Sequence, residues 1–395
     1  MKTGAKVFLI GTIGLVTAVV LSATGYVGYV LLSYNRLGYQ SPIVQHNSGE
    51  TSMPVGTQFR ALTYDLSYGA RSQDRTYFLD TGFDNEGNPT RGESAKGASA
   101  EEVNRNINGA FAFARKQNAV LHFFQSVDKK ADRSYGIDED YRAQQMFYAY
   151  DHVYAVDYHT PFLPYPFNDM SGSAISGMAT FSFFPITYAA RRELPVAQSM
   201  AKFFDIDRCY SYAVVPTSNG KRLYAVNVHL STYAEPEIRN AQIRELNDFL
   251  AERKTAGDYV IAGGNWNYDL LSYNLSFSSN GGFTPTYDAS NRPFAQKKKD
   301  PEWVTPLFHD KDGNVNPFME GFRMVAADNA PTRRNGDIAW SSGESYVCVL
   351  DGFLVSDNVT VVSNTNLKTT AGKLGTDGFA YSDHDPASLD FILNA

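Results

Sequence analysis

The N-terminal region carries an uncharged stretch that only one kind of structure accommodates. Residues 7–35 read VFLIGTIGLVTAVVLSATGYVGYVLLSYN, with Lys2 and Lys6 before them and Arg36 after them. About 20 apolar residues cross a bilayer as a helix, whereas the apolar core of a cleaved signal peptide has roughly 7–15. We therefore predict a single transmembrane helix over 7–35 that acts as an uncleaved signal anchor.

The charges around this stretch predict its orientation. The two lysines and the N-terminal amine precede the span, and positive charge favours the cytoplasmic side. We expect residues 1–6 in the cytoplasm and the C-terminal domain outside the cell membrane, although Arg36 and Arg60 flank the other end. Residues 36–56 mix Gly, Pro, Ser and Thr without periodicity and are predicted to be a tether.

Composition places the remaining segment, 57–395, among folded domains. The chain is 43% hydrophobic and 19% charged, which suits a globular protein rather than a disordered one. Its net charge of −7 argues against a broad basic surface for nucleic acid, although a local cleft can still be positive. The dense basic cluster at 297–299 is interpreted as a solvated loop.

Cys209 and Cys348 lie in apolar runs outside any metal-binding pattern, so buried free thiols are expected, with one disulfide as the alternative for an exported domain.

Strand-like and helix-like segments alternate along this domain. Ser99 and Glu102 form a capping-box pattern that opens a helix. A second helix is predicted over 138–150, and a third follows Glu235 with Gly257 as its C-cap. Many neighbouring strands look like hairpins, so we predict an α/β fold of the α+β type with mixed sheets rather than a doubly wound parallel sheet.

One predicted strand ends in two amides that point to the same side. Residues 261–269 read IAGGNWNYD, an apolar strand followed by Asn265 and Asn267. Residues two apart on an extended strand point the same way, so both amides can face one cleft. A polar turn after the strand is the alternative explanation.

Further polar side chains stand at the ends of other predicted strands. Taken singly, each has an ordinary explanation. A lone histidine at a strand end is more often structural, and Asp351 inside an apolar strand is explained by pairing with a neighbour, because unpaired burial is costly. Together they form a candidate site of eight residues: Asp65, Gln125, His229, Asn265, Asn267, Asp351, Asp383 and His384.

The order of the surrounding motifs resembles a known superfamily. The segments LTYD, FFQSVD, SGMATFS, VNVHLS, GGNWN, LDGFLVS and SDHDP follow one another across residues 58–395, in an order similar to that of the endonuclease/exonuclease/phosphatase (DNase I-like) superfamily. KFFDIDRCY and the aromatic loop before SGMATFS resemble its membrane-anchored members from Gram-positive bacteria. The resemblance implies a four-layer sandwich, in which two packed mixed β-sheets are flanked by helices, with a cleft where the loops meet.

The resemblance also implies phosphoester hydrolysis assisted by a divalent ion. The family includes nucleases, bacterial sphingomyelinases and inositol-polyphosphate 5-phosphatases, in which the ion polarises the phosphate while a water attacks in line. Residue by residue, the resemblance places Mg²⁺ or Mn²⁺ against Asp65, Gln125 and Asp383. The remaining candidates would act on the phosphate, the water and the leaving group: His229, Asn265, Asn267, Asp351 and His384.

Three positions depart from the family pattern. The resemblance leads us to expect asparagine at 65, glutamate at 125 and aspartate at 265, where this chain has Asp65, Gln125 and Asn265. The first two changes exchange acid and amide, so the charge at the metal site is expected to be unchanged, although Mg²⁺ prefers charged oxygen ligands. The third removes the group that orients or deprotonates the water, and losing a general base costs about 10²–10⁴-fold. Asp269 and Asp383 are the nearby carboxylates that could substitute.

Two functions of different classes therefore stay open. One is a membrane-anchored, extracytoplasmic phosphoesterase acting on a lipid headgroup, a nucleotide or a nucleic acid. The anchor, together with a loop rich in Pro, Phe and Tyr that is predicted from Asp157 to Ser173, favours a substrate near the membrane. The other function is that of a catalytically impaired pseudoenzyme that serves as a surface binding or scaffold module, and it is motivated by Gln125 and Asn265.

Overall fold

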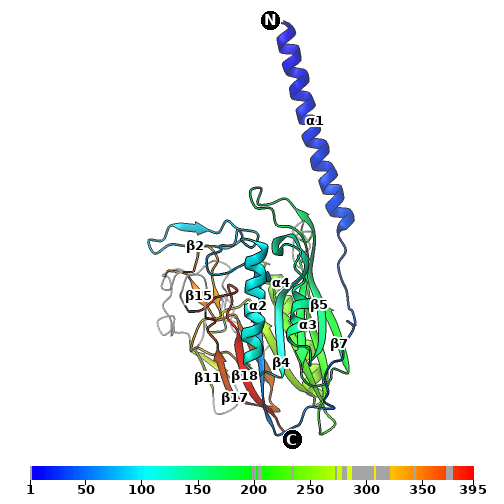
Figure 1. Ribbon diagram of the computed structural model, residues 1–395, viewed down its shortest axis with the longest axis vertical. Coiled ribbons are helices and arrows are strands. Elements are labelled where there is room, and N and C mark those ends of the chain that lie inside the picture. Colours follow the sequence, from blue (N-terminus) through cyan, green and yellow to red (C-terminus); the bar gives the residue numbers. More distant parts are fainter. Residues whose placement is uncertain are drawn as a thin grey trace.

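The computed structural model contains two six-stranded β-sheets packed face to face (Figure 1). It describes residues 2–197, 199, 202, 207–232, 235–271, 274–277, 283–286, 307, 321–340, 344–370 and 377–395. The basic cluster at 297–299 lies outside these residues.

Each sheet is mixed, as predicted. The first has the order β17 (Val359–Asn366), β18 (Ala387–Leu393), β1 (Gln58–Asp65), β4 (Leu121–Ala131), β6 (Gly172–Ser182) and β5 (Asp151–Leu163). The second has the order β13 (Phe322–Val325), β16 (Asp351–Ser356), β10 (Tyr259–Asn265), β9 (Arg222–His229), β8 (Cys209–Pro216) and β7 (Tyr188–Glu193). The β1–β4 and β9–β10 pairs are parallel, and the neighbouring pairs are antiparallel. Short two-stranded sheets pair β2 (Thr81–Phe83) with β3 (Pro89–Arg91), β11 (Asn274–Phe277) with β12 (Phe283–Thr286), and β14 (Arg333–Arg334) with β15 (Val347–Cys348).

Apolar side chains define four layers. The two sheets bury one shared cluster, in which Phe123 and Phe391 of the first sheet meet Ile261 of the second. On the outer face of the first sheet lie α2 (Ala100–Lys116) and α3 (Glu139–Met146), with Phe111 in the contact. On the outer face of the second sheet lies α4 (Pro236–Thr255), which buries Leu246. This helix–sheet–sheet–helix order confirms the predicted fold class.

Local sequence signals begin and end the helices. Ser99 Oγ accepts the Glu102 amide at 3.2 Å, so the predicted N-cap of α2 is confirmed. Gly257 follows α4 with a φ of 78°, the left-handed conformation that glycine adopts without strain. The predicted end of the second helix at 150 is wrong: α3 ends at Met146 because Phe147 turns out of helical geometry and buries its ring in the core.

The loop predicted from Asp157 to Ser173 is shorter than expected. Strand β5 continues to Leu163 because its residues pair with β6, including Tyr158 with Ser176 and Thr160 with Ala174. Asp157 therefore belongs to a strand. The connection that remains, 164–171, keeps the aromatic and proline residues at the end of the sandwich.

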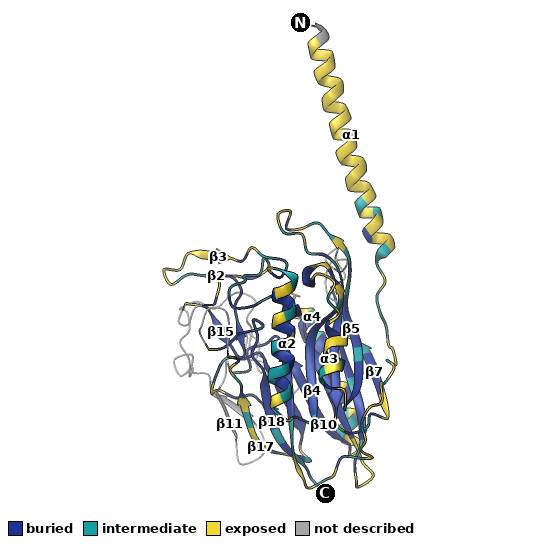
Figure 2. Ribbon diagram, viewed as in Figure 1, coloured by how far each residue is buried: buried dark blue, intermediate teal, exposed yellow. Residues whose placement is uncertain are grey.

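The N-terminal helix α1 (Lys2–Ser33) projects away from the sandwich and is exposed along most of its length (Figures 1 and 2). It is long and apolar enough to cross a membrane. The segment predicted as a tether, 36–56, runs along the domain and forms bridges from Gln40 to Arg191, from Gln45 to His152 and from Met53 to Thr217. Both cysteines are free and buried, as expected.

The centre of the second sheet depends on a glycine. A Cβ placed at Gly264 of β10 would lie 1.9 Å from the carbonyl oxygen of Val228 on the neighbouring strand. We expect Gly264→Ala to lower the free energy of unfolding by about 1–3 kcal/mol or more, because the strands must move apart. Urea unfolding followed by the fluorescence of buried Trp266 measures this effect. Gly49→Ala is the control, since nothing lies within 4 Å of its Cβ, and equal stabilities of the two variants would contradict the prediction.

Candidate active site

The candidate residues meet at one end of the sandwich, and pairing register explains why. His229, Asn265 and Asp351 are lateral partners on β9, β10 and β16, so three site residues lie side by side in the second sheet. Asp65 ends β1 in the first sheet and pairs in register with Gln125. His384 lies in the loop before β18. It forms an isolated β-bridge with Arg333, a residue of β14, which holds it at this end of the sandwich.

A cavity of about 490 Å³ opens at this level. Five of the eight predicted residues line it: Asp65, His229, Asn265, Asn267 and His384. The other three are buried and stand behind or beside the lining: Gln125, Asp351 and Asp383. The structure therefore brings most of the predicted site together but divides it into residues that face the cavity and residues that support them.

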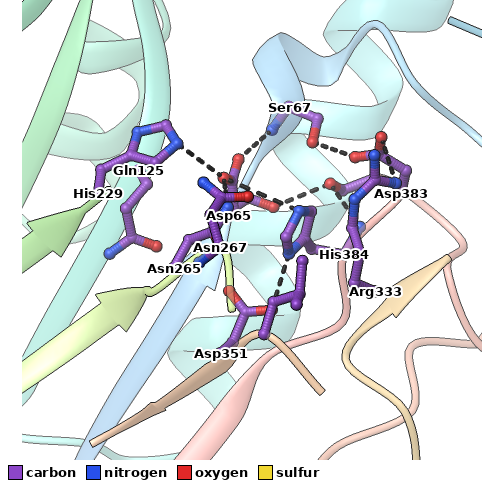
Figure 3. A network of polar contacts seen from close by, with 12 residues as sticks. Asp65, Ser67, Gln125, His229, Asn265, Asn267, Arg333, Asp351, Asp383 and His384 are labelled. Carbon is purple, nitrogen blue, oxygen red and sulfur yellow. Dashed lines mark hydrogen bonds and ion pairs between the residues drawn. The ribbon is translucent and has the colours of Figure 1, made fainter. Parts of the chain in front are cut away.

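A hydrogen bond between the two sheets forms the floor of the cavity (Figure 3). Asn265 Nδ2 donates to Asp65 Oδ2 at 2.8 Å, while Ser67 N donates to the other carboxylate oxygen, Oδ1, at 2.9 Å. Asn265 Oδ1 in turn accepts the backbone amide of Asn267 at 2.9 Å. The Asn267 side chain donates to the carbonyl oxygen of Leu230 at 2.7 Å, so both predicted amides are held in place.

The amide that contacts Asp65 is not the one at position 125, which the sequence led us to set against the acid at position 65. The residue bonded to Asp65 is Asn265, whereas the Gln125 amide donates to Asn227 Oδ1 at 2.7 Å and accepts from Thr63. Relative to the pattern that the motifs resemble, the acid and the amide have changed places across the Asp65–Asn265 hydrogen bond. The carboxylate is retained at the cavity floor, on β1 instead of β10.

Two histidines, each oriented by its own carboxylate, lie on either side of Asp65. His229 Nδ1 is 2.8 Å from Asp157 Oδ2, and His384 Nδ1 is 2.7 Å from Asp351 Oδ2. A carboxylate at Nδ1 favours the tautomer with the proton on that nitrogen. Nε2 of both rings then faces the cavity, 3.6 Å from Asp65 Oδ2 for His229 and 4.0 Å for His384.

The charges of this cluster depend on one another. Burial alone would raise the pKa of Asp65, but the imidazoles of His384 and His229 and the hydrogen bond from Asn265 outweigh it and bring that pKa below its ordinary value. Burial lowers the pKa of His384, but Asp351 and Asp65 raise it by more, so it lies above the ordinary 6.5. The arrangement therefore favours an ionised Asp65 and a protonated His384.

The two carboxylates that could have replaced the missing base do not face the cavity. Asp383 Oδ2 is 2.7 Å from Arg333 Nη1 and 3.3 Å from Arg71 Nη1, and its other oxygen accepts from Ser67 Oγ. Burial would raise the pKa of Asp383, but these arginines bring it far below the ordinary range, which makes it a poor base. Asp269 is buried outside the lining and accepts the Leu271 amide.

The residues predicted to hold Mg²⁺ or Mn²⁺ do not fit that role. The Gln125 amide is bonded away from the cavity, Asp383 is paired with two arginines, and both oxygens of Asp65 already accept hydrogen bonds. Within the described ranges, no three His, Cys, Asp or Glu side chains are grouped so that they could hold a metal ion. Mg²⁺ requires oxygen ligands in near-octahedral geometry and is usually bound by carboxylates, and of the two carboxylates in this donor set only Asp65 lines the cavity.

Cationic side chains take up much of the cavity wall instead. Five line it, against Asp65 as the one carboxylate among the lining residues that the structure describes: Arg71, Lys96, Arg133, Arg208 and Arg333. Arg208 is 4% exposed, and its Nε and Nη1 atoms are buried without a hydrogen-bond partner in the described part of the chain. Its ion pair to Asp157 Oδ2 is 3.7 Å long. A cavity-lining arginine with buried donors that lack a hydrogen bond suits an anion such as phosphate.

Sequence reasoning missed Arg208 and Asp157. Arg208 lies inside the KFFDIDRCY segment, but nothing in its spacing marks it as functional. Asp157 was assigned to a loop. The signal that could have identified it is the one that identified Asp351, an acidic residue inside a run of apolar strand residues.

Comparison with known proteins gives similarity of structure alone. No protein-family model and no curated protein matches the sequence. The endonuclease/exonuclease/phosphatase from Beutenbergia cavernae DSM 12333 is similar, with 11% identity, a TM-score of 0.49 and coverage of 86% of this chain and 72% of that chain. D. rerio TDP2, solved in complex with single strand DNA product, has 12% identity, a TM-score of 0.49 and coverage of 85% and 99%. An endonuclease/exonuclease/phosphatase family protein from Leptotrichia buccalis C-1013-b has 11% identity, a TM-score of 0.48 and coverage of 84% of this chain and 98% of that chain.

Two of these three carry the name of the superfamily that the motifs resemble. Because all three TM-scores lie below 0.5, the fold assignment rests on the sheets and helices described above and not on this likeness. We take no activity from it, because sequence identity is near one tenth and a fold does not determine the chemistry of its site.

The pKa of His384 tests the arrangement of the cluster. Asp351→Asn removes the charge that raises this pKa most, so we expect the titration midpoint of the His384 Cε1–H resonance to fall. In the natural protein the raised pKa adds stability that is full below pH 6.5 and is lost as the pH rises through the higher native value. NMR titration measures the midpoint, and Asp390→Asn, which breaks the distant pair with Arg60, serves as control. An unchanged midpoint in Asp351→Asn would refute the arrangement.

The bond across the cavity floor predicts a strong coupling between positions 65 and 265. Asn265→Asp alone places a carboxylate against Asp65 Oδ2, so we expect a loss of about 1–3 kcal/mol in the free energy of unfolding. Adding Asp65→Asn restores one acid and one amide and should recover most of this loss. A double-mutant cycle from denaturant unfolding measures the coupling. Additive effects of the two substitutions would show that the side chains do not interact.

Proposed function

We propose that this protein is a membrane-attached phosphoester hydrolase whose two carboxylate-oriented histidines carry out general acid–base catalysis. The observation that carries the proposal is the convergence of both Nε2 atoms on Asp65 Oδ2, 3.6 and 4.0 Å away, at the floor of a cationic cavity. The two nitrogens are therefore no farther apart than the sum of these distances, which lets them contact opposite sides of one phosphate group.

The histidines have different roles in this reaction. Nε2 of His229 accepts a proton from an attacking water, and Nε2 of protonated His384 donates a proton to the leaving oxygen. A P–O bond to the water oxygen forms as the P–O bond to the leaving group breaks, which gives a phosphate product and an alcohol. The raised pKa of His384 supports the role of acid, and each histidine is held in one tautomer by its partner carboxylate.

Asp65 supplies the carboxylate that position 265 lacks. Its Oδ2 atom is fixed by Asn265 beside the Nε2 atom of His229, so it can accept a hydrogen bond from a water that gives its other proton to the histidine. Its lowered pKa makes Asp65 an orienting group rather than the base. The exchange of acid and amide therefore does not by itself exclude catalysis.

Arginine supplies the positive charge that the reaction requires. Arg208 lines the cavity with its Nε and Nη1 atoms buried and without a hydrogen-bond partner in the described part of the chain, and Arg71 lines the cavity as well. Preorganised donors in a water-poor site stabilise the charge that develops on phosphoryl oxygens. No step of this mechanism is routed through a metal ion, because the residues at the expected metal site do not fit one. The domain is proposed to lie outside the cytoplasm, on the orientation that Lys2 and Lys6 favour.

A binding or scaffold protein is the second candidate, and one observation favours it. Asp65 is held by Asn265 and Ser67 and lies between two imidazoles, so the interactions of this carboxylate are satisfied before any ligand enters. Such a site can hold an anion without turning it over. The assay below separates the two functions.

Hydrolysis is tested on full-length protein in nanodiscs with bis-p-nitrophenyl phosphate, in EDTA and with added Mg²⁺ or Mn²⁺. We expect p-nitrophenol release that persists in EDTA and falls about 10²–10⁴-fold in His229→Ala and in His384→Ala. His46→Asn, an exposed histidine outside the cavity, is the control and should keep full activity. Absence of turnover in every condition would favour the binding function, and turnover that requires the metal would refute the metal-free mechanism.

A further inference from the structure

The end of the N-terminal helix is part of the cavity wall. Tyr26 of α1 lines the cavity together with Leu163, the last residue of β5, and Tyr165 of the loop 164–171 that follows it. Tyr26 Oη donates to the carbonyl oxygen of Phe162, and the Phe162 amide donates to Tyr29 Oη, both at 3.0 Å. These reciprocal bonds join the helix to the end of β5, from which the loop 164–171 continues beside the lower end of α1 (Figure 1).

The segment after the helix restricts the movement of α1 relative to the domain. Arg36 pairs with Glu193 at 3.2 Å and with Asp207 at 3.5 Å, and the Leu37 amide donates to Asp207 at 2.6 Å. Gln40 then bridges to Arg191. Four attachments directly after α1 therefore hold the cavity at a fixed place relative to the helix end.

Helix length places the cavity mouth at the membrane surface. From Val7 to Tyr26 the helix has about 20 residues, and at about 1.5 Å per residue they span about 30 Å, the hydrocarbon thickness of a bilayer. Tyr26 and Tyr29 then lie at the interface, where tyrosine is enriched. The cavity that Tyr26 lines opens at the same level.

The loop beside the helix carries apolar side chains that suit this level. Phe167 is 77% exposed, and Phe162, Tyr165 and Met170 are exposed as well. Exposed aromatic residues grouped at one end of a domain indicate a surface that contacts protein or membrane. Because this loop is attached to the helix that we propose to span the membrane, we infer that its exposed side chains contact the membrane rather than another protein.

We propose that the cavity receives the phosphate headgroup of an anionic phospholipid that remains in the bilayer spanned by α1, with the loop 162–170 inserted among the headgroups. This inference rests on the proposed function for the chemistry and adds the source of the substrate. The cationic side chains that line the cavity, Arg208 among them, complement the headgroup phosphate. The apolar side chains of Leu163, Pro164 and Leu79 at the same cavity suit the lipid part next to it.

Insertion of the loop is tested by fluorescence. Full-length protein carrying Phe167→Cys is labelled with an environment-sensitive dye and placed in nanodiscs that contain brominated lipid. Tyr148→Cys is the matched control, since Tyr148 is 73% exposed on the turn after α3, away from α1. We expect quenching of the dye at 167 to exceed that at 148 by at least tenfold. Equal quenching at the two positions would overturn the proposal.

Use of a lipid substrate is tested in the same nanodiscs with phosphatidylglycerol or phosphatidylcholine alone. Release of diacylglycerol or phosphatidate is followed by mass spectrometry, beside turnover of bis-p-nitrophenyl phosphate. We expect Phe167→Ser with Met170→Ser to lower lipid turnover at least tenfold and to leave turnover of the soluble diester unchanged, because neither residue lines the cavity. Tyr148→Ser should change neither rate. Soluble turnover without lipid turnover would overturn this inference alone.

Binding is measured separately, so that a failure of catalysis is recognised. Spin-labelled phosphatidylglycerol in the nanodiscs should show an immobilised fraction with the natural protein that falls at least threefold with Arg208→Gln. If no substrate is turned over but this fraction and the quenching at 167 are present, hydrolysis fails while the lipid-facing cavity stands. If the fraction is the same for both proteins, the headgroup site is refuted.

Discussion

The hydrogen bond from Asn265 to Asp65 joins the two sheets at the point where the candidate chemistry takes place. Asp65 ends a strand of one sheet and Asn265 ends a strand of the other. The apolar cluster between the sheets brings these strand ends together, and the polar bond sets their relative position. Because Asp65 Oδ2 is held there, two histidines from separate segments can both be oriented toward it.

The electrostatics of the site follow from this one ionised carboxylate. Asp65 helps to raise the pKa of His384, and the histidines in turn keep Asp65 ionised although it is buried. Carboxylates outside the cavity lining neutralise the charge of two lining arginines. Asp128 forms an ion pair with Arg133, and Asp383 forms one with Arg333. Arg208 is less fully compensated, which leaves donors for an anion. The cavity thus carries a positive wall on a protein whose net charge is negative.

The contacts of helix α1 with the domain fix the orientation of the cavity relative to this helix. A free linker after a membrane anchor would let the domain rotate and would set no relation between cavity and bilayer. Here the chain after the helix is bonded to the domain, and two tyrosines of the helix are bonded to the loop at the cavity. Helix α1, the loop after β5 and the cavity therefore lie together at one end of the domain.

Sequence alone determined the features that depend on local pattern. Hydrophobic length indicated α1, periodicity and caps indicated α2 and α4, and polar residues at strand ends indicated five of the residues that line the cavity. What only the tertiary structure decided is which side chains meet. The side chain of Asn265 hydrogen-bonds to Asp65, whereas that of Gln125, the neighbour of Asp65 in the sheet, bonds to Asn227, because side-chain direction at a strand end depends on the packing of two sheets. Asp157 and Arg208 were found only in three dimensions, since their roles arise from contacts with residues far away in the chain.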